Sequence, residues 1–311
     1  MDFAAYRQFT QQQLFEVHGH RLCPWSEETI ASLNAPQAWH PDNPNGHGVV
    51  LIHGLFESPY HMRAIGDWFC QQGYLVHSVL LPGHGTQPDD LIDMEYDAWI
   101  EASQFVIDLT QAQVDQLIVC GHSTGGLLAI YHALRNPSID RLVLSAPCLK
   151  VASRFAGLAP MMQGLSELFP RLQWLSRKEE NDVTKYQSVA TNAVVQLQHL
   201  MKIVSSDLQH ATREWPMMVL ASAQDTTVSS AAVLDFFQQF ADDNSRLLYY
   251  SKHLTHLLHD TRIHVVQSTG TVHPSLLRSP DDPHYGADGE MPEYNPKFSH
   301  LTAALQDFLT R

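Results

Sequence analysis

Short apolar runs alternate with segments of helical periodicity along most of the chain from residue 48 onward. The runs are rich in β-branched residues and are closed by glycine or proline, which is typical of the buried strands of a parallel sheet. Between them, apolar residues recur three and four positions apart, as on the buried face of a helix. The predicted strands are 49–52, 74–81, 116–120 and 141–145, and the predicted helices between them are 59–72, 97–111 and 124–134.

The same alternation resumes near the C-terminus. Regular alternation with short links favours parallel strands joined by right-handed helical crossovers, and therefore an α/β fold with a doubly wound, mostly parallel sheet. An N-terminal helix is expected over 3–17, ahead of a loop that is rich in proline. The later predicted strands are 217–221, 246–250 and 262–267, and the later predicted helices are 229–240 and 298–309.

Residues 148–214 interrupt this rhythm. The segment has helical spacings but no clear strand, and its front half is apolar, with Met161, Met162, Leu165 and Phe169. We therefore expect a helical cap, or lid, inserted between late strands, with residues 1–147 and 215–311 forming the core. The apolar residues of the cap either line a pocket for an acyl chain or pack the cap onto the core.

Composition narrows the classes of partner. The net charge is −14, so neither nucleic acid nor an anionic membrane surface is expected to be a main partner. Cys23, Cys70, Cys120 and Cys148 form no Cys-x-x-Cys pair and predict free thiols in a reducing compartment. The N-terminus does not resemble a signal peptide, and no apolar run is long enough to span a bilayer. These features favour a cytoplasmic protein.

The most specific motif is Gly121-His122-Ser123-Thr124-Gly125, which follows a predicted strand and precedes a predicted helix. A sharp strand-to-helix turn of this kind presents a nucleophilic serine, and the residues two positions before and after it must be small. We therefore predict Ser123 as a nucleophile. The backbone N–H of Thr124, at the start of the helix, is expected to stabilise a developing oxyanion.

The second oxyanion donor is expected in the loop after the first strong strand, which begins His53-Gly54-Leu55-Phe56. Gly54 allows the backbone to approach the nucleophile closely. The N–H of Leu55 is the first candidate and that of Phe56 the alternative. We interpret His53 as a residue that braces this loop by hydrogen bonding rather than as a catalytic base.

The acid and the base should follow late strands, with the acid first in the chain. Asp225 lies just past the strand 217–221, whereas Asp207 and Asp235 have the spacing of helix-surface residues. Two histidines are candidates for the base. His273 follows the strand 262–267 in a loop flanked by glycine and proline, and it is preferred; His253 follows the strand 246–250 and is the alternative.

Together these motifs resemble the α/β-hydrolases close to monoacylglycerol lipases, lysophospholipases and bacterial carboxylesterases. The matching segments are 50–54, 81–85, 121–126 and 223–225. The resemblance implies a triad of Ser123, Asp225 and a late histidine, with Leu55 and Thr124 as the oxyanion donors. One departure from the family pattern is the additional segment 251–261 between the acid and the preferred histidine. The stretches 273–275 and 279–286 are similar to the histidine loop of some bacterial relatives.

The sequence therefore predicts a hydrolase of carboxylic esters that forms an acyl-enzyme, acts on a small-molecule ester (an acyl lipid among the candidates) and needs no cofactor. The same triad also cleaves thioesters and peptides, and a non-catalytic binding protein on this fold is a further alternative. The 19 histidines, with His253, His256 and His259 spaced three apart, raise the alternative of a metal enzyme. No cysteine partners or His-Glu-x-x-His motif accompany them, so no metal site is predicted.

Overall fold

Eight strands form one large sheet in a computed structural model of the chain. The structure describes residues 1–18, 26–152, 159–166, 169–180, 182–253, 260–268, 271–273, 276–281 and 294–311. The eight strands lie in the order β1-β3-β2-β4-β5-β8-β9-β10, and each neighbouring pair is parallel except β1 with β3. The strands are β1 (Ala38–Trp39), β2 (His47–Ile52), β3 (Leu75–Val79), β4 (Gln116–His122), β5 (Ile139–Ser145), β8 (Met217–Ser222), β9 (Arg246–Ser251) and β10 (Ile263–Gln267).

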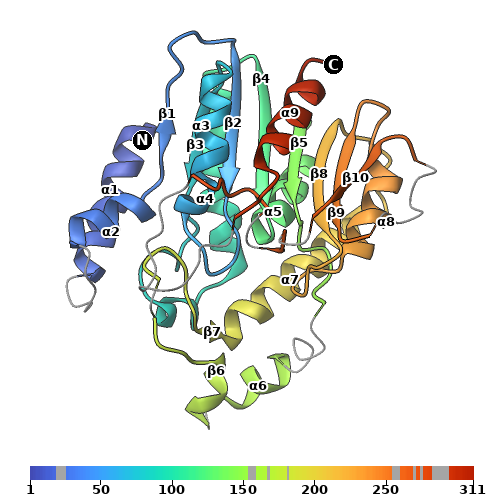
Figure 1. Cartoon of the computed structure of the whole chain (residues 1–311). Coiled ribbons are helices and arrows are strands. Elements are labelled where there is room, and N and C mark those ends of the chain that lie inside the picture. Colours follow the sequence, from blue (N-terminus) through green and yellow to red (C-terminus); the bar gives the residue numbers. More distant parts are fainter. Residues whose placement is uncertain are drawn as a thin grey trace.

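Helices cover both faces of the sheet, as Figure 1 shows. The predicted doubly wound, mostly parallel sheet is confirmed. The predicted helix over 59–72 is divided into a 3-10 turn, η1 (Pro59–Met62), and α3. The helices of the core are α1 (Phe3–His18), α2 (Glu27–Asn34), α3 (Arg63–Gln71), α4 (Tyr96–Gln111), α5 (Thr124–Arg135), α8 (Ser230–Phe240) and α9 (Phe298–Leu309).

Alternate residues of each buried strand contribute to two different cores. In β2, Val49 and Leu51 pack with Ile65 of α3 and Leu305 of α9. Val50 and Ile52 face the opposite side, where α4, α5, α7 and α8 supply the partners. Successive side chains of a strand point to opposite faces, so a strand covered by helices on both sides must be apolar throughout. This is why the central strands appear in the sequence as continuous apolar runs.

The segment between β5 and β8 contains more than helices. It includes α6 (Ala159–Leu165), a 3-10 turn η4 (Pro170–Gln173), two short antiparallel strands β6 (Trp174–Ser176) and β7 (Val189–Ala190), and α7 (Thr191–Leu208). The expectation that 148–214 holds no strand is therefore wrong. Strands of two or three residues are too short to show a periodicity of two. For the same reason the sequence did not reveal β1.

This segment contacts loops at the C-terminal edge of the sheet. Asn192 of α7 donates its side-chain amide to Leu91 O and Met94 O, and Tyr186 N–H donates to Phe56 O at 2.7 Å. Figure 1 shows α6, β6 and β7 beyond this end of the sheet. In the described part of the chain, no helix has the length and apolar character needed to cross a membrane.

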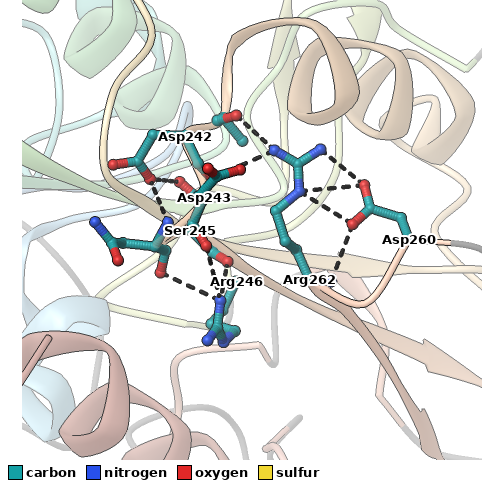
Figure 2. Close-up of polar contacts among 8 residues, drawn as sticks. Asp242, Asp243, Ser245, Arg246, Asp260 and Arg262 are labelled. Carbon is teal, nitrogen blue, oxygen red and sulfur yellow. Dashed lines mark hydrogen bonds and ion pairs between the residues drawn. The ribbon is translucent and has the colours of Figure 1, made fainter.

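At the opposite end of the sheet, where the strands begin, an arginine links several segments by hydrogen bonds (Figure 2). Arg262, just before β10, donates from Nη1 to Ala241 O at 2.6 Å and binds the carboxylate of Asp260 through Nε and Nη2. Its guanidinium also lies 5.3 Å from the centre of the Phe237 ring. Arg262 thereby joins α8 to β10 at the N-terminal ends of the strands, away from the loops that follow β2, β4 and β8.

Candidate active site

Ser123 occupies a strained turn between β4 and α5. Its φ of 53° and ψ of −113° are unusual for a residue with a side chain. Backbone hydrogen bonds hold it there: its N–H donates to Ser145 O at 2.9 Å, and its carbonyl accepts from Leu127 N–H and Cys148 N–H at 3.1 and 3.0 Å. The side chain is therefore fixed at the C-terminal end of β4, and the residue as a whole is 8% exposed.

The glycines on either side of Ser123 are required by close contacts. A Cβ on Gly121 would lie 2.1 Å from Gly125 O, and a Cβ on Gly125 would lie 2.0 Å from Ile52 O. Both distances are far below van der Waals contact, so no other residue fits without moving the backbone. The sequence argument that these positions must lack bulk has a direct structural basis.

His273 and Asp225 form a buried hydrogen-bonded pair. Nδ1 of His273 donates to Oδ2 of Asp225 at 2.7 Å, and Oδ1 of Asp225 accepts the backbone N–H groups of Thr227 and Val228 at 2.8 Å each. Burial opposes the charge of Asp225, but the hydrogen bond from His273 and the two backbone bonds outweigh it and hold the pKa below its usual range. Asp225 is therefore ionised at neutral pH, and its contact with Nδ1 fixes the orientation of the His273 ring.

The structure brings this pair close to the turn that holds Ser123. The ring of His273 lies 4.8 Å from the ring of His122, which directly precedes Ser123. His253, the alternative base, is exposed at the end of β9, and its N–H donates to Ser251 Oγ. Within the described ranges, Asp225 makes its side-chain contact with His273 and not with His253. Gly270 and Pro274, which flank His273 in the sequence, lie outside the described residues.

The loop after β2 lies against Ser123. A Cβ on Gly54 would lie 3.2 Å from the Cβ of Ser123. The next N–H, that of Leu55, donates to no acceptor in the described part of the chain. Phe56, with φ of 69°, turns the chain after it. The Leu55 N–H thus lies directly after Gly54, the residue that approaches Ser123. The Thr124 N–H lies in the first turn of α5, where backbone N–H groups lack intrahelical acceptors.

His53 supports this loop and has no catalytic geometry. Its Nδ1 donates to Gly54 O at 2.8 Å and its Nε2 accepts from Leu81 N–H at 3.1 Å. Burial, reinforced by repulsion from His84, lowers the pKa of His53 to about 3, so the imidazole is neutral. Both nitrogens are occupied by backbone groups, as expected for a bracing residue.

The sequence did not single out Glu57 and His122 as functional residues. Glu57 accepts the Gly54 N–H at 3.0 Å, and its other oxygen lies 3.8 Å from Nε2 of His122. His122 is held on its other side by Ser145 Oγ, 3.0 Å from Nδ1. Motif reasoning treats His122 as a variable position and Glu57 as a loop residue. The one available signal was an acidic side chain close behind a buried strand.

Three of the four apolar residues noted in the front half of the cap segment are at the surface, and the fourth, Met162, is half-buried. Met161 is 62% exposed, Leu165 41% and Phe169 58%. They do not pack the segment onto the core, which was one of the two alternatives for them. Leu168 lies outside the described residues.

The structure offers no metal site in the described ranges, since no three His, Cys, Asp or Glu side chains gather there. His256, His259 and Cys23 lie outside these ranges. Cys70, Cys120 and Cys148 are free thiols. Burial raises the pKa of the Cys120 thiol well above its usual range and that of Cys148 to about 12, so both are protonated at neutral pH.

Several known proteins with similar sequences are hydrolases. A family model described as serine aminopeptidase, S33, matches residues 43–262. A thermostable monoacylglycerol lipase from Bacillus sp. (strain H-257) is 25% identical over 204 residues, which cover 65% of this chain and 79% of that protein. Phospholipase YtpA from Bacillus subtilis (strain 168) is 28% identical over 231 residues, 66% of this chain and 86% of that protein.

Solved structures share the fold at low identity. A solved structure from work on the metagenome-derived lipolytic enzymes LipS and LipT superposes on this chain with a TM-score of 0.65 at 18% identity. The superposition covers 89% of this chain and 97% of that one. A soluble variant of monoglyceride lipase from Saccharomyces cerevisiae gives a TM-score of 0.61 at 12% identity, covering 88% of this chain and 91% of that one. These similarities support the α/β-hydrolase fold.

Proposed function

Because this chain belongs to the serine aminopeptidase S33 family of α/β-hydrolases, we propose that it hydrolyses carboxylic esters through an acyl-enzyme on Ser123. The observation that carries the proposal is the 2.7 Å hydrogen bond between His273 and Asp225, made beside the strained turn that holds Ser123. A buried, ionised carboxylate that fixes one imidazole nitrogen is the arrangement a serine hydrolase needs in its base. The monoacylglycerol lipase and phospholipase names of the two Bacillus relatives support ester substrates.

In the proposed reaction, Nε2 of His273 takes the proton of the Ser123 hydroxyl as Oγ attacks the ester carbonyl. The N–H groups of Leu55 and Thr124 bind the resulting oxyanion. His273 then returns the proton to the departing alcohol, which leaves Ser123 acylated. Water, deprotonated by His273, attacks the acyl carbonyl and releases the carboxylic acid, and the proton returns to Ser123. Asp225 stabilises the imidazolium at each transition state.

We assign residues 148–214 as a cap over the catalytic edge of the sheet. Support comes from contacts of two of its parts. Ala152 N–H donates to Thr227 O next to Asp225, and Tyr186 N–H donates to Phe56 O next to Leu55. The exposed apolar side chains of this cap favour substrates with medium or long acyl chains, because apolar walls bind acyl groups.

The test is a panel of p-nitrophenyl esters from acetate to laurate, with intact-mass detection of the acyl-enzyme. Ser123→Ala should abolish turnover and adduct formation, whereas Ser299→Ala, at an exposed serine of α9, should not change either. Full activity in Ser123→Ala would rule out the proposed nucleophile. Turnover of acetate equal to or better than that of octanoate would contradict the preference for longer chains.

The family description favours one further candidate, cleavage of N-terminal amino acids from peptides. The same triad cleaves amides, because only the leaving group differs. Aminoacyl p-nitroanilides distinguish the two. An ester hydrolase should turn over p-nitrophenyl esters at least tenfold faster than the matching anilides after correction for their intrinsic reactivity, and the reverse order would favour the peptidase.

A further inference from the structure

Glu57 is a buried carboxylate inside the loop that follows β2. The residue is 4% exposed, and Oε2 accepts the Gly54 N–H at 3.0 Å. A Cβ on Gly54 would lie 2.8 Å from this same oxygen and 3.2 Å from the Cβ of Ser123. The carboxylate therefore lies on the same backbone segment that touches the nucleophile. Burying an ionisable group is costly, so its presence here requires an explanation.

The other oxygen of Glu57 faces the histidines of the site. Oε1 lies 3.8 Å from Nε2 of His122, a buried nitrogen without a hydrogen-bond partner in the described part of the chain. The ring of His122 lies 4.8 Å from the ring of His273, and its Nδ1 is held by Ser145 Oγ. His122 thus fills the space between Glu57 and His273.

Glu57 is the negative member of this group. Burial alone would raise the pKa of Glu57, but attraction to His122, His61 and Lys185 outweighs burial and holds the pKa below its usual range. Burial lowers the pKa of His122 and of His61 to about 4, against the attraction of Glu57. The pKa of Glu57 lies below those of both histidines, so the carboxylate is the charged member of this group at neutral pH.

We propose that Glu57 is a positioning residue of the hydrolytic site, which fixes the loop bearing the Leu55 N–H and adds a second negative charge, besides Asp225, near the imidazole of His273. The proposal rests on the function proposed above. Through the first role Glu57 aligns an oxyanion donor. Through the second it favours the imidazolium that His273 becomes in the transition state.

The charges around His273 come from several elements. Asp225 follows β8 and is hydrogen-bonded to it, His122 ends β4, and Glu57 follows β2. Glu57 in turn faces His61 of η1 and Lys185 of the cap. Asp225 and Glu57 are thus two anions from different elements whose electrostatic interactions include His273.

The test compares the wild-type protein with Glu57→Gln, which keeps an oxygen for the Gly54 N–H but removes the charge. The rate of Ser123 labelling by a fluorophosphonate is measured from pH 5 to 9, together with kcat/KM for a p-nitrophenyl ester. In the labelling step Oγ forms a bond to phosphorus, fluoride leaves, and the proton passes to His273. Glu57→Asp, which keeps the charge, and Glu101→Gln, at an exposed glutamate of α4, are the controls.

Without the carboxylate the protonated form of His273 is less favoured. The acid limb of both profiles should therefore move to lower pH by roughly half a unit in Glu57→Gln. The plateau rate should fall about tenfold or more, because the imidazolium and the oxyanion lose support. Glu57→Asp should keep the wild-type acid limb, and Glu101→Gln should match the wild type in both limb and plateau.

An unmoved acid limb in a folded Glu57→Gln protein would overturn the electrostatic role, and an unchanged plateau would overturn the alignment role. If Glu57→Gln fails to fold, the pair Glu57→Asp and Glu57→Asn, matched in size, gives the same comparison. The labelling rate does not depend on the substrate. An absence of ester turnover in the wild type, with normal labelling, would count against the proposed function and leave the test of Glu57 valid.

Discussion

The change Asp225→Asn tests how the base of the proposed triad is held. In the wild-type site one carboxylate serves three donors. Oδ1 accepts two backbone N–H groups at 2.8 Å each and Oδ2 accepts the Nδ1–H of His273 at 2.7 Å. An amide has one oxygen, so it cannot serve both sides. The two backbone N–H groups should keep that oxygen as their hydrogen-bond acceptor, which turns the amide NH₂ toward His273.

An NH₂ group facing Nδ1 forces the other tautomer of His273, with its proton on Nε2. This tautomer cannot take the proton of Ser123. The loss of a correctly held base of this kind costs about 10³–10⁴-fold in kcat. At 1.36 kcal/mol per tenfold, that corresponds to about 4–5.5 kcal/mol on the barrier. We expect kcat to fall by this factor and KM to change little, because Asp225 does not contact bound substrate in the proposed reaction.

The assay is steady-state hydrolysis of a p-nitrophenyl ester, with far-UV circular dichroism to establish folding. Asp235→Asn is the matched control, since Asp235 is exposed on α8, and it should keep wild-type kcat. Activity of Asp225→Asn within about tenfold of the wild type would refute the reasoning, because His273 would then not depend on Asp225 for its tautomer.

The effect of Asp225→Asn on the free energy of unfolding should depend on pH. The pKa of Asp225 in the folded state lies below its unfolded value of about 3.9. A depressed carboxyl pKa contributes stability above the unfolded pKa, and this contribution is lost as the pH falls through the folded pKa. The difference in the free energy of unfolding between wild type and Asp225→Asn should therefore narrow between pH 5 and pH 2. Urea titrations at fixed pH measure it, and a constant difference would contradict the linkage.

Three further predictions concern other positions. His273→Ala should abolish ester turnover and His253→Ala should retain it, as measured by kcat/KM; the opposite result would make His253 the base. Arg262→Met should lower the free energy of unfolding by about 1–3 kcal/mol, because the carbonyl of Ala241 and the carboxylate of Asp260 lose their hydrogen-bond donor. It should leave kcat/KM unchanged. Urea titrations measure the loss of stability, and a change below 0.5 kcal/mol, on the order of the error, would refute the prediction. Gly125→Ala should give little folded protein, because its Cβ would overlap a backbone oxygen; normal yield and melting temperature would contradict the contact.

Sequence reasoning succeeded where local pattern and fold coincide. The central strands are covered on both faces, so they needed unbroken apolar runs, and these runs are visible in the sequence. The turn at Ser123 needed Gly121 and Gly125 for steric reasons that act within a few residues. It was less secure for the base, because His253 and His273 both follow strands and only the tertiary contact with Asp225 distinguishes them.

The contacts of Glu57 could not be predicted in this way. The groups that face it are His61 nearby, His122 at the end of β4 and Lys185 in the cap, and no spacing rule relates these positions. The partners of Arg262 also depend on how α8 and β9 are placed. Short strands such as β6 and β7 owe their existence to pairing with each other, not to their own residues. Features that depend on packing between distant segments leave no periodic signal.

The arrangement of the site also explains how the backbone strain at Ser123 is maintained. A residue held at φ of 53° costs about 1–3 kcal/mol, which the neighbouring structure must supply. Three backbone hydrogen bonds from β5, α5 and the segment after β5 hold Ser123 directly, and the β2 loop closes over it through Gly54. Each of these supports lies at or next to a strand end or in the first turns of a helix. The strain is therefore opposed by the part of the molecule with the most buried apolar contacts, which keeps Ser123 fixed.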